Sequence, residues 1–247
     1  MRLSAGAAPA HTGSHAHAMN APLAIVSSMA TRQVLAELLA AYESRAGQPA
    51  ALSAMGGVDA AKRLRAGEAF DVAILASDAI GELAREGRLV PGSRVDLVRS
   101  GVAIAVRAGA PRPSIATEDD VRRAVLDARA IGYSTGPSGV RLAKLFERWG
   151  IAGVIAERIV QAPPGVPVGT LVARGDVDLG FQQLSELRDL PGIDVLGPLP
   201  DPIQIVTTFS GAVTATSARP DAGRALLSYL ASPAGDVAKR RRGMEPA

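Results

Sequence analysis

Three consecutive pairs of an apolar strand and an amphipathic helix open the chain, and this alternation limits the folds that it can form. The expected strands cover residues 23–26, 50–54 and 70–75, and apolar residues recur at helical spacing after each of them. The first helix ends at Gly47 and Pro49, the second at Gly67 and the third near Gly87. Strands that alternate with helices form a parallel sheet covered by helices. The pattern therefore predicts an α/β fold whose ligand binds beyond the carboxyl ends of the strands.

Two long extended runs interrupt the alternation, which restarts between them. The first run covers residues 95–107, and the second covers residues 203–215 after Pro200 and Pro202. A strand of this length suits a segment that leaves one lobe and enters another, and two such crossings make a hinge. We therefore predict two lobes, with residues 21–107 plus 208–247 in lobe 1 and residues 108–207 in lobe 2. Residues 1–20 are small and polar and are expected to form a disordered tail.

The amino-acid composition excludes several kinds of catalytic and metal-binding site. The chain has no cysteine, and its histidines, His11, His15 and His17, all lie in the expected tail. Thiolate nucleophiles, zinc–sulfur sites and a histidine base in the folded body are thereby excluded, so we expect no metal, no cofactor and no assigned catalytic residue.

The charge and hydropathy of the chain limit the kinds of partner that it is expected to bind. Aromatic residues make up 3% of the chain, the net charge is +3, and the basic run at residues 239–242 is best interpreted as a solvated helix end, so nucleic acid is not expected. The sequence contains no run of 18 or more apolar residues, so insertion into a membrane is not expected. The first residues lack the apolar segment of a signal peptide. This predicts a cytoplasmic protein as the chain stands, or a periplasmic one where a leader was removed or the start is misplaced.

A strand at residues 131–133 runs into a loop of small residues and then into a periodic helix. The loop holds Ser134, Thr135, Gly136, Pro137, Ser138 and Gly139. We predict Ser138 as the helix N-cap, and the free backbone N–H groups of the helix start would attract an anion. No lysine follows the glycines, which disfavours a nucleoside triphosphate. The alternative is that Ser138 only caps the helix and Gly139 only permits close packing.

Other candidates follow further strands, and each has a structural alternative. Ser28 and Met29 follow the first strand, and Ser28 could instead cap a helix; Gly56 and Gly57 follow the second and could simply form a turn. Gln182 and Gln183 follow a later strand, their side chains are expected to point different ways, and either could instead satisfy a loop backbone.

Four titratable residues could serve a proton-transfer enzyme: Asp71, Asp78, Glu186 and Tyr133. Asp78 is more simply interpreted as an N-cap, and Asp71 as the first residue of a strand. We therefore assign none of the four to the site.

The motifs at residues 27–30, 56–61, 70–72, 180–183 and 243–246 resemble the substrate-binding proteins of ABC importers, and the molybdate-binding group most of all. The resemblance implies a two-lobed periplasmic-binding-protein type II fold, with two parallel-sheet lobes joined by two crossing hinge strands. It also implies an oxyanion held by serine hydroxyls and backbone N–H groups. Gly56 and Gly57 stand where molybdate binders have a serine-rich turn. Gln182 and Gln183 stand near the position of the tyrosine ligand of molybdate binders. With these residues the site could also hold a carboxylate or a polyol. Residues 133–134 and 182–187 also resemble an aconitate isomerase that is similar to the molybdate-binding proteins.

Three functions remain open at this point. The chain could be a monomeric receptor that captures a small anion, a molybdate-like oxyanion or a small carboxylate, for an ABC transporter permease or for sensing. It could be an isomerase that shifts an allylic proton on a small polycarboxylate, or the ligand-sensing domain of a regulator. We expect the receptor, with these ligand-binding residues: Ser28, Met29, Gly56, Gly57, Ser134, Thr135, Ser138, Gly139, Gln182 and Gln183.

Overall fold

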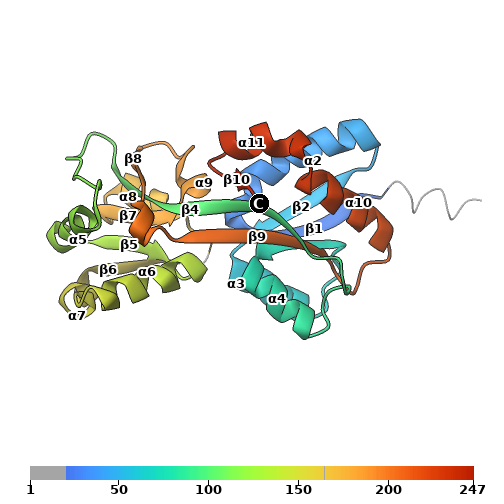
Figure 1. Ribbon diagram of the computed structural model, residues 1–247, viewed down its shortest axis with the longest axis horizontal. Helices are drawn as coiled ribbons and strands as arrows, with labels where there is room; N and C mark the ends of the chain where they lie inside the picture. Colours follow the sequence, from blue (N-terminus) through green and yellow to red (C-terminus); the bar gives the residue numbers. More distant parts are fainter. Residues whose placement is uncertain (1–20, 164) are drawn as a thin grey trace, which may run out of the picture.

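The computed structural model of the chain describes residues 21–163 and 165–247. The expected tail of residues 1–20 lies outside the described residues. Figure 1 shows two lobes of sheet and helix joined by two long strands that lie side by side, β4 and β9. In the part of the chain that the structure describes, no helix is long and apolar enough to cross a bilayer.

Lobe 1 contains the three strand–helix units that the alternation predicts. Strands β1 (Leu23–Ser28), β2 (Ala50–Met55) and β3 (Val72–Ala76) are parallel in the order β2-β1-β3, and β9 (Val206–Val213) adds an antiparallel strand beside β3. The helices of these units are η1 (Met29–Thr31), α2 (Arg32–Ala46), α3 (Gly57–Arg65) and α4 (Ser77–Arg85). The α2 side of the sheet forms one apolar cluster, and the α3 and α4 side forms another. Since the three parallel strands end at the same edge, the residues after β1, β2 and β3 meet there.

Lobe 2 repeats this plan. Strands β5 (Ile131–Ser134), β6 (Ile159–Ala162) and β7 (Leu179–Gln183) are parallel, and β4 (Val95–Arg107) and β8 (Ile193–Pro198) extend the sheet with antiparallel pairing. Its helices are α5 (Glu118–Asp127), α6 (Pro137–Arg148), α7 (Ala152–Ile155), η2 (Ala156–Arg158), α8 (Val168–Arg174) and α9 (Leu184–Leu187). The apolar stripe of α6 faces the main core of this lobe and is buried there through Leu142, Leu145 and Phe146. The sheets of both lobes are mixed rather than wholly parallel, because the crossing strands run against their neighbours.

The first crossing strand has the bounds that the sequence predicts, and the second is shorter. β4 covers Val95–Arg107, whereas β9 covers Val206–Val213 because the chain forms a 3-10 turn, η3 (Asp201–Ile203), just before it. Gln204 ties the two segments together: its Oε1 accepts from the Val102 and Ile205 amides at 3.0 and 2.8 Å.

The crossing strand β4 changes partners in its middle. Residues 95–101 pair with β9, and residues 102–107 pair with β7 and β8 of lobe 2. The division of the chain into lobes stays a proposal, and this pairing supports a boundary near Gly101 rather than after residue 107.

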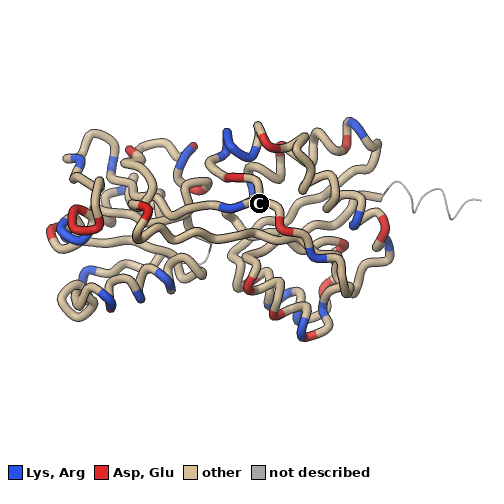
Figure 2. The backbone as a smooth tube through the Cα atoms, in the orientation of Figure 1, with Lys and Arg blue, Asp and Glu red and all other residues tan. Residues whose placement is uncertain are grey.

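The C-terminal segment returns to lobe 1 through α10 (Pro220–Ala231), η4 (Pro233–Gly235), α11 (Asp236–Arg241) and β10 (Glu245–Pro246). Leu226, Leu227 and Leu230 of α10 are buried against the α2 side of the sheet. The basic run does end a helix, but Lys239 is buried, with 1% of its surface exposed and its ammonium 3.3 Å from Asp236. The prediction of a wholly solvated run is therefore wrong at this residue. In Figure 2, charged residues of both signs are spread along the backbone of both lobes.

Candidate functional site

A cavity of about 440 Å³ lies between the lobes, at the carboxyl ends of their strands. Nine of the ten predicted site residues line it: Ser28, Met29, Gly56, Gly57, Ser134, Thr135, Ser138, Gln182 and Gln183. Gly139 is not among the described residues of its wall. A Cβ atom at Gly139 would lie 1.7 Å from the Ser134 carbonyl oxygen, so the absence of a side chain there lets α6 pack against the end of β5.

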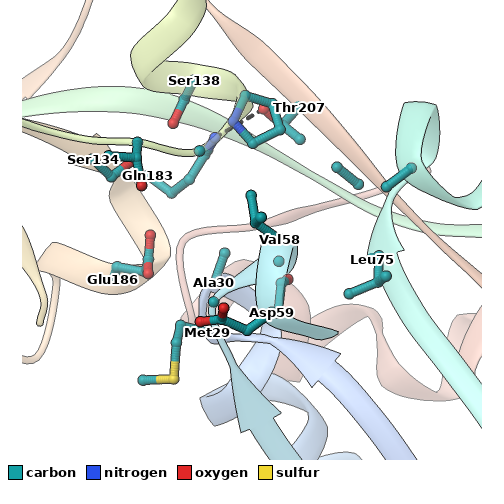
Figure 3. Close-up of a pocket in the computed structure, with 18 of the residues that line it drawn as sticks. Met29, Ala30, Val58, Asp59, Leu75, Ser134, Ser138, Gln183, Glu186 and Thr207 are labelled. Atoms are coloured by element: carbon teal, nitrogen blue, oxygen red, sulfur yellow. Dashed lines mark hydrogen bonds between the residues drawn. The ribbon is translucent and has the colours of Figure 1, made fainter. Parts of the chain in front are cut away.

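Two buried side-chain atoms in this wall have no hydrogen-bond partner within the described residues: Ser28 Oγ and Gln183 Oε1. Ser28 ends β1 in lobe 1 and is 7% exposed, and its hydroxyl makes no capping bond to η1. Gln183 ends β7 in lobe 2, is 4% exposed, and donates through Nε2 to Thr207 Oγ1 at 2.9 Å. Figure 3 shows this contact in the close-up of the cavity. Since buried polar groups are nearly always paired in folded proteins, these two atoms make this part of the wall a candidate site for a ligand.

The Gln183 amide can offer either of its ends to that ligand. The Thr207 hydroxyl both donates and accepts, so a half-turn of the amide keeps the contact with Thr207 and turns the NH₂ group into the cavity. Thr207 belongs to the crossing strand β9, and no local pattern in the sequence distinguishes it as a site residue.

The Gln182 side chain makes different hydrogen bonds from those of Gln183. Its Oε1 accepts from the Val168 amide at 2.8 Å and from the Gly169 amide at 3.4 Å, which satisfies the start of α8. The two glutamines therefore point different ways, as the alternation of a strand predicts. The structural alternative holds for Gln182, and Gln183 is the one whose amide is incompletely paired.

Helices α3 and α6 both begin at the cavity, and α6 begins two residues earlier than predicted. The N-cap of α6 is Gly136, with Pro137 in the first helical position, so the prediction of Ser138 as the N-cap is wrong. Proline has a backbone angle suited to the first turn and lacks the N–H that would be left free there. Helix α3 also has a glycine N-cap, Gly56, and begins at Gly57. The first residues of both helices line the cavity, and their first-turn amides, which have no helical partners, favour negative charge at these helix starts.

The charged residues of the cavity wall are mostly acidic. They are Asp59, Glu82 and Glu186, with Arg65 as the basic member among the described residues. The Arg65 guanidinium is engaged by Glu86 at 2.9 Å and Glu82 at 3.2 Å. An anion in the cavity must therefore be held by neutral hydroxyl, amide and backbone groups rather than by a cation. No group of three or more Asp, Glu or His side chains in residues 21–163 and 165–247 could hold a metal ion.

Of the four titratable residues considered for proton transfer, Glu186 lies in the cavity wall. Burial raises its pKa to about 7, and a hydrogen bond with Gln182 opposes part of that rise. Asp71 lies elsewhere in lobe 1, where it accepts from the Ala24 amide at 3.0 Å and from Arg219 at 2.8 Å. Tyr133 is buried edge-on against Phe146.

The prediction that Asp78 caps a helix is also wrong. The N-cap of α4 is Ala76, because the helix begins at Ser77, the residue directly after β3. Asp78 instead forms an exposed ion pair with Arg141 of α6, at 3.2 Å across the two lobes.

Comparison with known proteins identifies the relatives of this chain. An aconitate isomerase of a Pseudomonas species is 39% identical over 230 residues, which cover 91% of this chain and 87% of that protein. The periplasmic molybdate-binding protein of Azotobacter vinelandii superposes with a TM-score of 0.74 at 19% identity, over 89% of this chain and 97% of that one. The sulfate-binding protein SubI of Mycobacterium tuberculosis gives 0.75 at 18% identity, over 92% and 87%. These two likenesses confirm the predicted periplasmic-binding-protein fold.

The family is shown by a second comparison. The profile of the bacterial extracellular solute-binding proteins matches residues 23–245, which is nearly all of the structure described above. The chain therefore belongs to the family of bacterial extracellular solute-binding proteins.

Proposed function

We propose that this solute-binding protein captures a small organic anion with two or three carboxylates in the cavity between its lobes. The observation that carries the proposal is the pair of unpaired buried atoms, Ser28 Oγ in lobe 1 and Gln183 Oε1 in lobe 2. A ligand that bonds both side chains must contact both lobes at once, so it favours the closed arrangement. Neutral donors and helix starts can hold a desolvated anion because its charge is shared among many hydrogen bonds.

The size and lining of the cavity support an organic anion over a tetrahedral oxyanion. A volume of about 440 Å³ lies in the range of sites for small organic ligands, roughly 300–1,000 Å³. Much of the wall is apolar and could cover a carbon skeleton: Met29, Leu75, Val166 and Phe209. An oxyanion of four oxygens would leave most of this apolar surface against water.

A thermal-shift and calorimetric screen tests the proposal. The panel comprises cis-aconitate, trans-aconitate, citrate, molybdate and sulfate at matched ionic strength. We expect at least one carboxylate to stabilise the protein more than molybdate or sulfate does, since a ligand at 100 times its Kd adds about 2.7 kcal/mol. Tighter binding of molybdate than of every carboxylate would contradict the proposed ligand class.

Isomerisation of the bound polycarboxylate is the second candidate, and two observations favour it. The relative at 39% identity is an aconitate isomerase, and Glu186 places a carboxyl group with a pKa near neutrality in the cavity wall. In an allylic shift, a base takes a proton from the methylene carbon, the double bond moves, and a proton is returned to the far carbon, with no net oxidation. Proton NMR of trans-aconitate with the protein in D₂O should show the cis isomer with deuterium incorporated. Binding of trans-aconitate without turnover would contradict the isomerase function and would leave the receptor function as the remaining proposal.

Membership of this family also supports a transport partner. We propose that a receptor of this kind acts as a monomer in the periplasm and delivers its anion to an ABC transporter permease. Osmotic-shock fractionation of cells that express the gene from its native locus tests the location. Recovery of the protein with the cytoplasmic markers would contradict the transport role.

A further inference from the structure

We infer that Glu186 is the proton-carrying group of the cavity and faces the bound anion as a neutral carboxylic acid, so that each anion brings a proton with it. This inference rests on the proposed capture of a carboxylate. It adds that affinity depends on pH through one named side chain of the protein.

Glu186 lines the same cavity as Gln183, whose amide oxygen has no partner among the described residues. Helix α9 (Leu184–Leu187) follows Gln183 directly, and Glu186 and Gln183 both line the cavity. Figure 3 shows Glu186 on the lobe 2 side, with Met29 and Asp59 contributed by lobe 1. An anion held by Gln183 therefore occupies the cavity that this carboxyl group lines.

No ion pair among the described residues involves Glu186. The other two acids of the wall differ from it: Glu82 pairs with Arg65 at 3.2 Å, and Asp59 is exposed. Helix α9 packs on β4, β7, α8 and η1. The charged residues of those elements and of the segments beside α9 are Asp96, Arg99, Arg107, Arg174, Arg188, Asp189 and Arg242. None of them forms a salt bridge with Glu186 in the described structure, so no cation there stabilises its ionised form.

Burial is therefore what sets the proton affinity of Glu186. Removal from water raises its pKa to about 7, and the contact with Gln182 opposes the rise only in part. A bound anion adds a like charge beside the carboxyl group, which raises the pKa further. At neutral pH the acid is then protonated in the complex, and its O–H group can donate a short hydrogen bond to the anion.

The sign of the pH dependence follows from linkage. The free protein loses the Glu186 proton as the pH rises through about 7, whereas the complex keeps it. Affinity is thus greatest below pH 7 and falls by up to about tenfold per pH unit above it. At pH 7.5 an acid with a pKa of about 7 is roughly three-quarters ionised, so binding takes up about 0.7 proton.

Calorimetry in two buffers of different ionisation enthalpy measures that uptake, with trans-aconitate and citrate as probes. Wild type should take up about 0.7 proton per anion at pH 7.5, and Glu186→Gln should bind the same anion with no uptake and a flat profile from pH 7 to 8.5. Titration of the anion itself is common to both proteins and cancels between them. Glu157→Gln removes an exposed carboxylate of the same lobe outside the cavity wall, and it should behave as wild type.

The outcomes separate this inference from the proposed function. If wild type and Glu186→Gln bind with equal uptake, Glu186 is not the proton carrier, although carboxylate capture stands. If neither carboxylate binds wild type, the proposed function fails instead. In that case ¹³C NMR titration of Glu186 in the free protein decides the inference, because a pKa near its ordinary 4.5 overturns it and a pKa above about 6.5 supports it.

Discussion

At the scale of single residues, the cavity is distinguished by polar atoms that the protein leaves unpaired. Ser27 and Ser28 are adjacent, and both are buried. Ser27 Oγ donates to the Ser28 carbonyl at 3.2 Å, whereas Ser28 Oγ has no partner among the described residues. A hydroxyl that is buried and unpaired costs folding free energy, so its presence is better explained by a ligand than by stability.

Ser28→Ala should therefore separate binding from stability. We expect anion binding to weaken by about 1.5–3 kcal/mol, the range for hydrogen bonds to charged groups, and the melting temperature of the free protein to stay equal or rise. Ser27→Ala is the matched control, which should lose stability by about 1 kcal/mol and keep its affinity. Calorimetry and thermal unfolding of both variants measure the two effects. A loss of stability in Ser28→Ala with unchanged affinity would assign the hydroxyl to the fold.

Glu186→Gln should stabilise the free protein at alkaline pH. A carboxyl group whose folded pKa is about 7 binds its proton more tightly in the folded state than in the unfolded state, so it lowers stability as the pH rises from about 4.3 to 7. The neutral amide removes that pH-dependent loss. We expect a higher melting temperature than wild type at pH 8 and a small difference at pH 5. A constant difference at both pH values would show that Glu186 does not titrate in this window.

At the scale of elements, the junction of β5 and α6 depends on a glycine rather than on a cap. Gly139 lies where a Cβ atom would meet the Ser134 carbonyl oxygen at 1.7 Å and Tyr133 Cδ2 at 3.1 Å. The nearer atom belongs to the backbone and cannot rotate away. Helix α6 therefore reaches its place, and its first amides reach the cavity, only with glycine at this position.

Gly139→Ala should both destabilise the protein and weaken anion binding. The clash moves α6 away from Ser134, and overpacking of this kind costs about 1–3 kcal/mol. Gly153→Ala in α7 is the matched control, because its added Cβ atom would meet nothing within 4 Å. Urea unfolding and calorimetry compare the two variants. Equal stability of both would show that the turn before α6 absorbs the added methyl group without strain.

At the scale of the whole molecule, Asp71 fastens the C-terminal segment to lobe 1. It accepts from Ser217 Oγ at 2.7 Å and from Arg219 at 2.8 Å, and both donors lie between β9 and α10. Burial opposes ionisation of this carboxyl group, but the hydrogen bonds from Ser217, the Ala24 amide and Arg219 outweigh it and lower its pKa. By contrast, the ion pairs that bridge the two lobes, Asp78–Arg141 and Asp189–Arg242, are largely exposed and contribute little to stability.

Asp71→Asn should reduce the acid sensitivity of the fold. Because the folded pKa lies below the unfolded value of about 3.9, Asp71 contributes stability above that value and loses it as the pH falls through the folded pKa. We expect the variant to be less stable than wild type at pH 7 and the gap to narrow toward pH 2–3. Asp176→Asn, at an exposed aspartate without an ion pair among the described residues, is the control. A gap that stays constant between pH 7 and 3 would contradict this role.

The sequence by itself determined the elements and the edge at which the site candidates meet. Local periodicity predicted the strand–helix units, and one apolar extended run predicted β4 with its observed bounds. Nine predicted residues line a single cavity because the carboxyl ends of parallel strands converge whatever the side chains are. None of this required knowledge of contacts between distant segments.

Only the tertiary structure decided which atoms in the cavity are free and which acid can carry a proton. Gln182 and Gln183 are indistinguishable in the sequence, and they differ because the start of α8 meets the first and Thr207 of β9 meets the second. Glu186 has a pKa near 7 because the fold of the lobe around α9 withdraws its carboxyl group from much of the surrounding water. Hydrogen-bond partners and burial are supplied by residues far apart in the chain, so no local pattern encodes them.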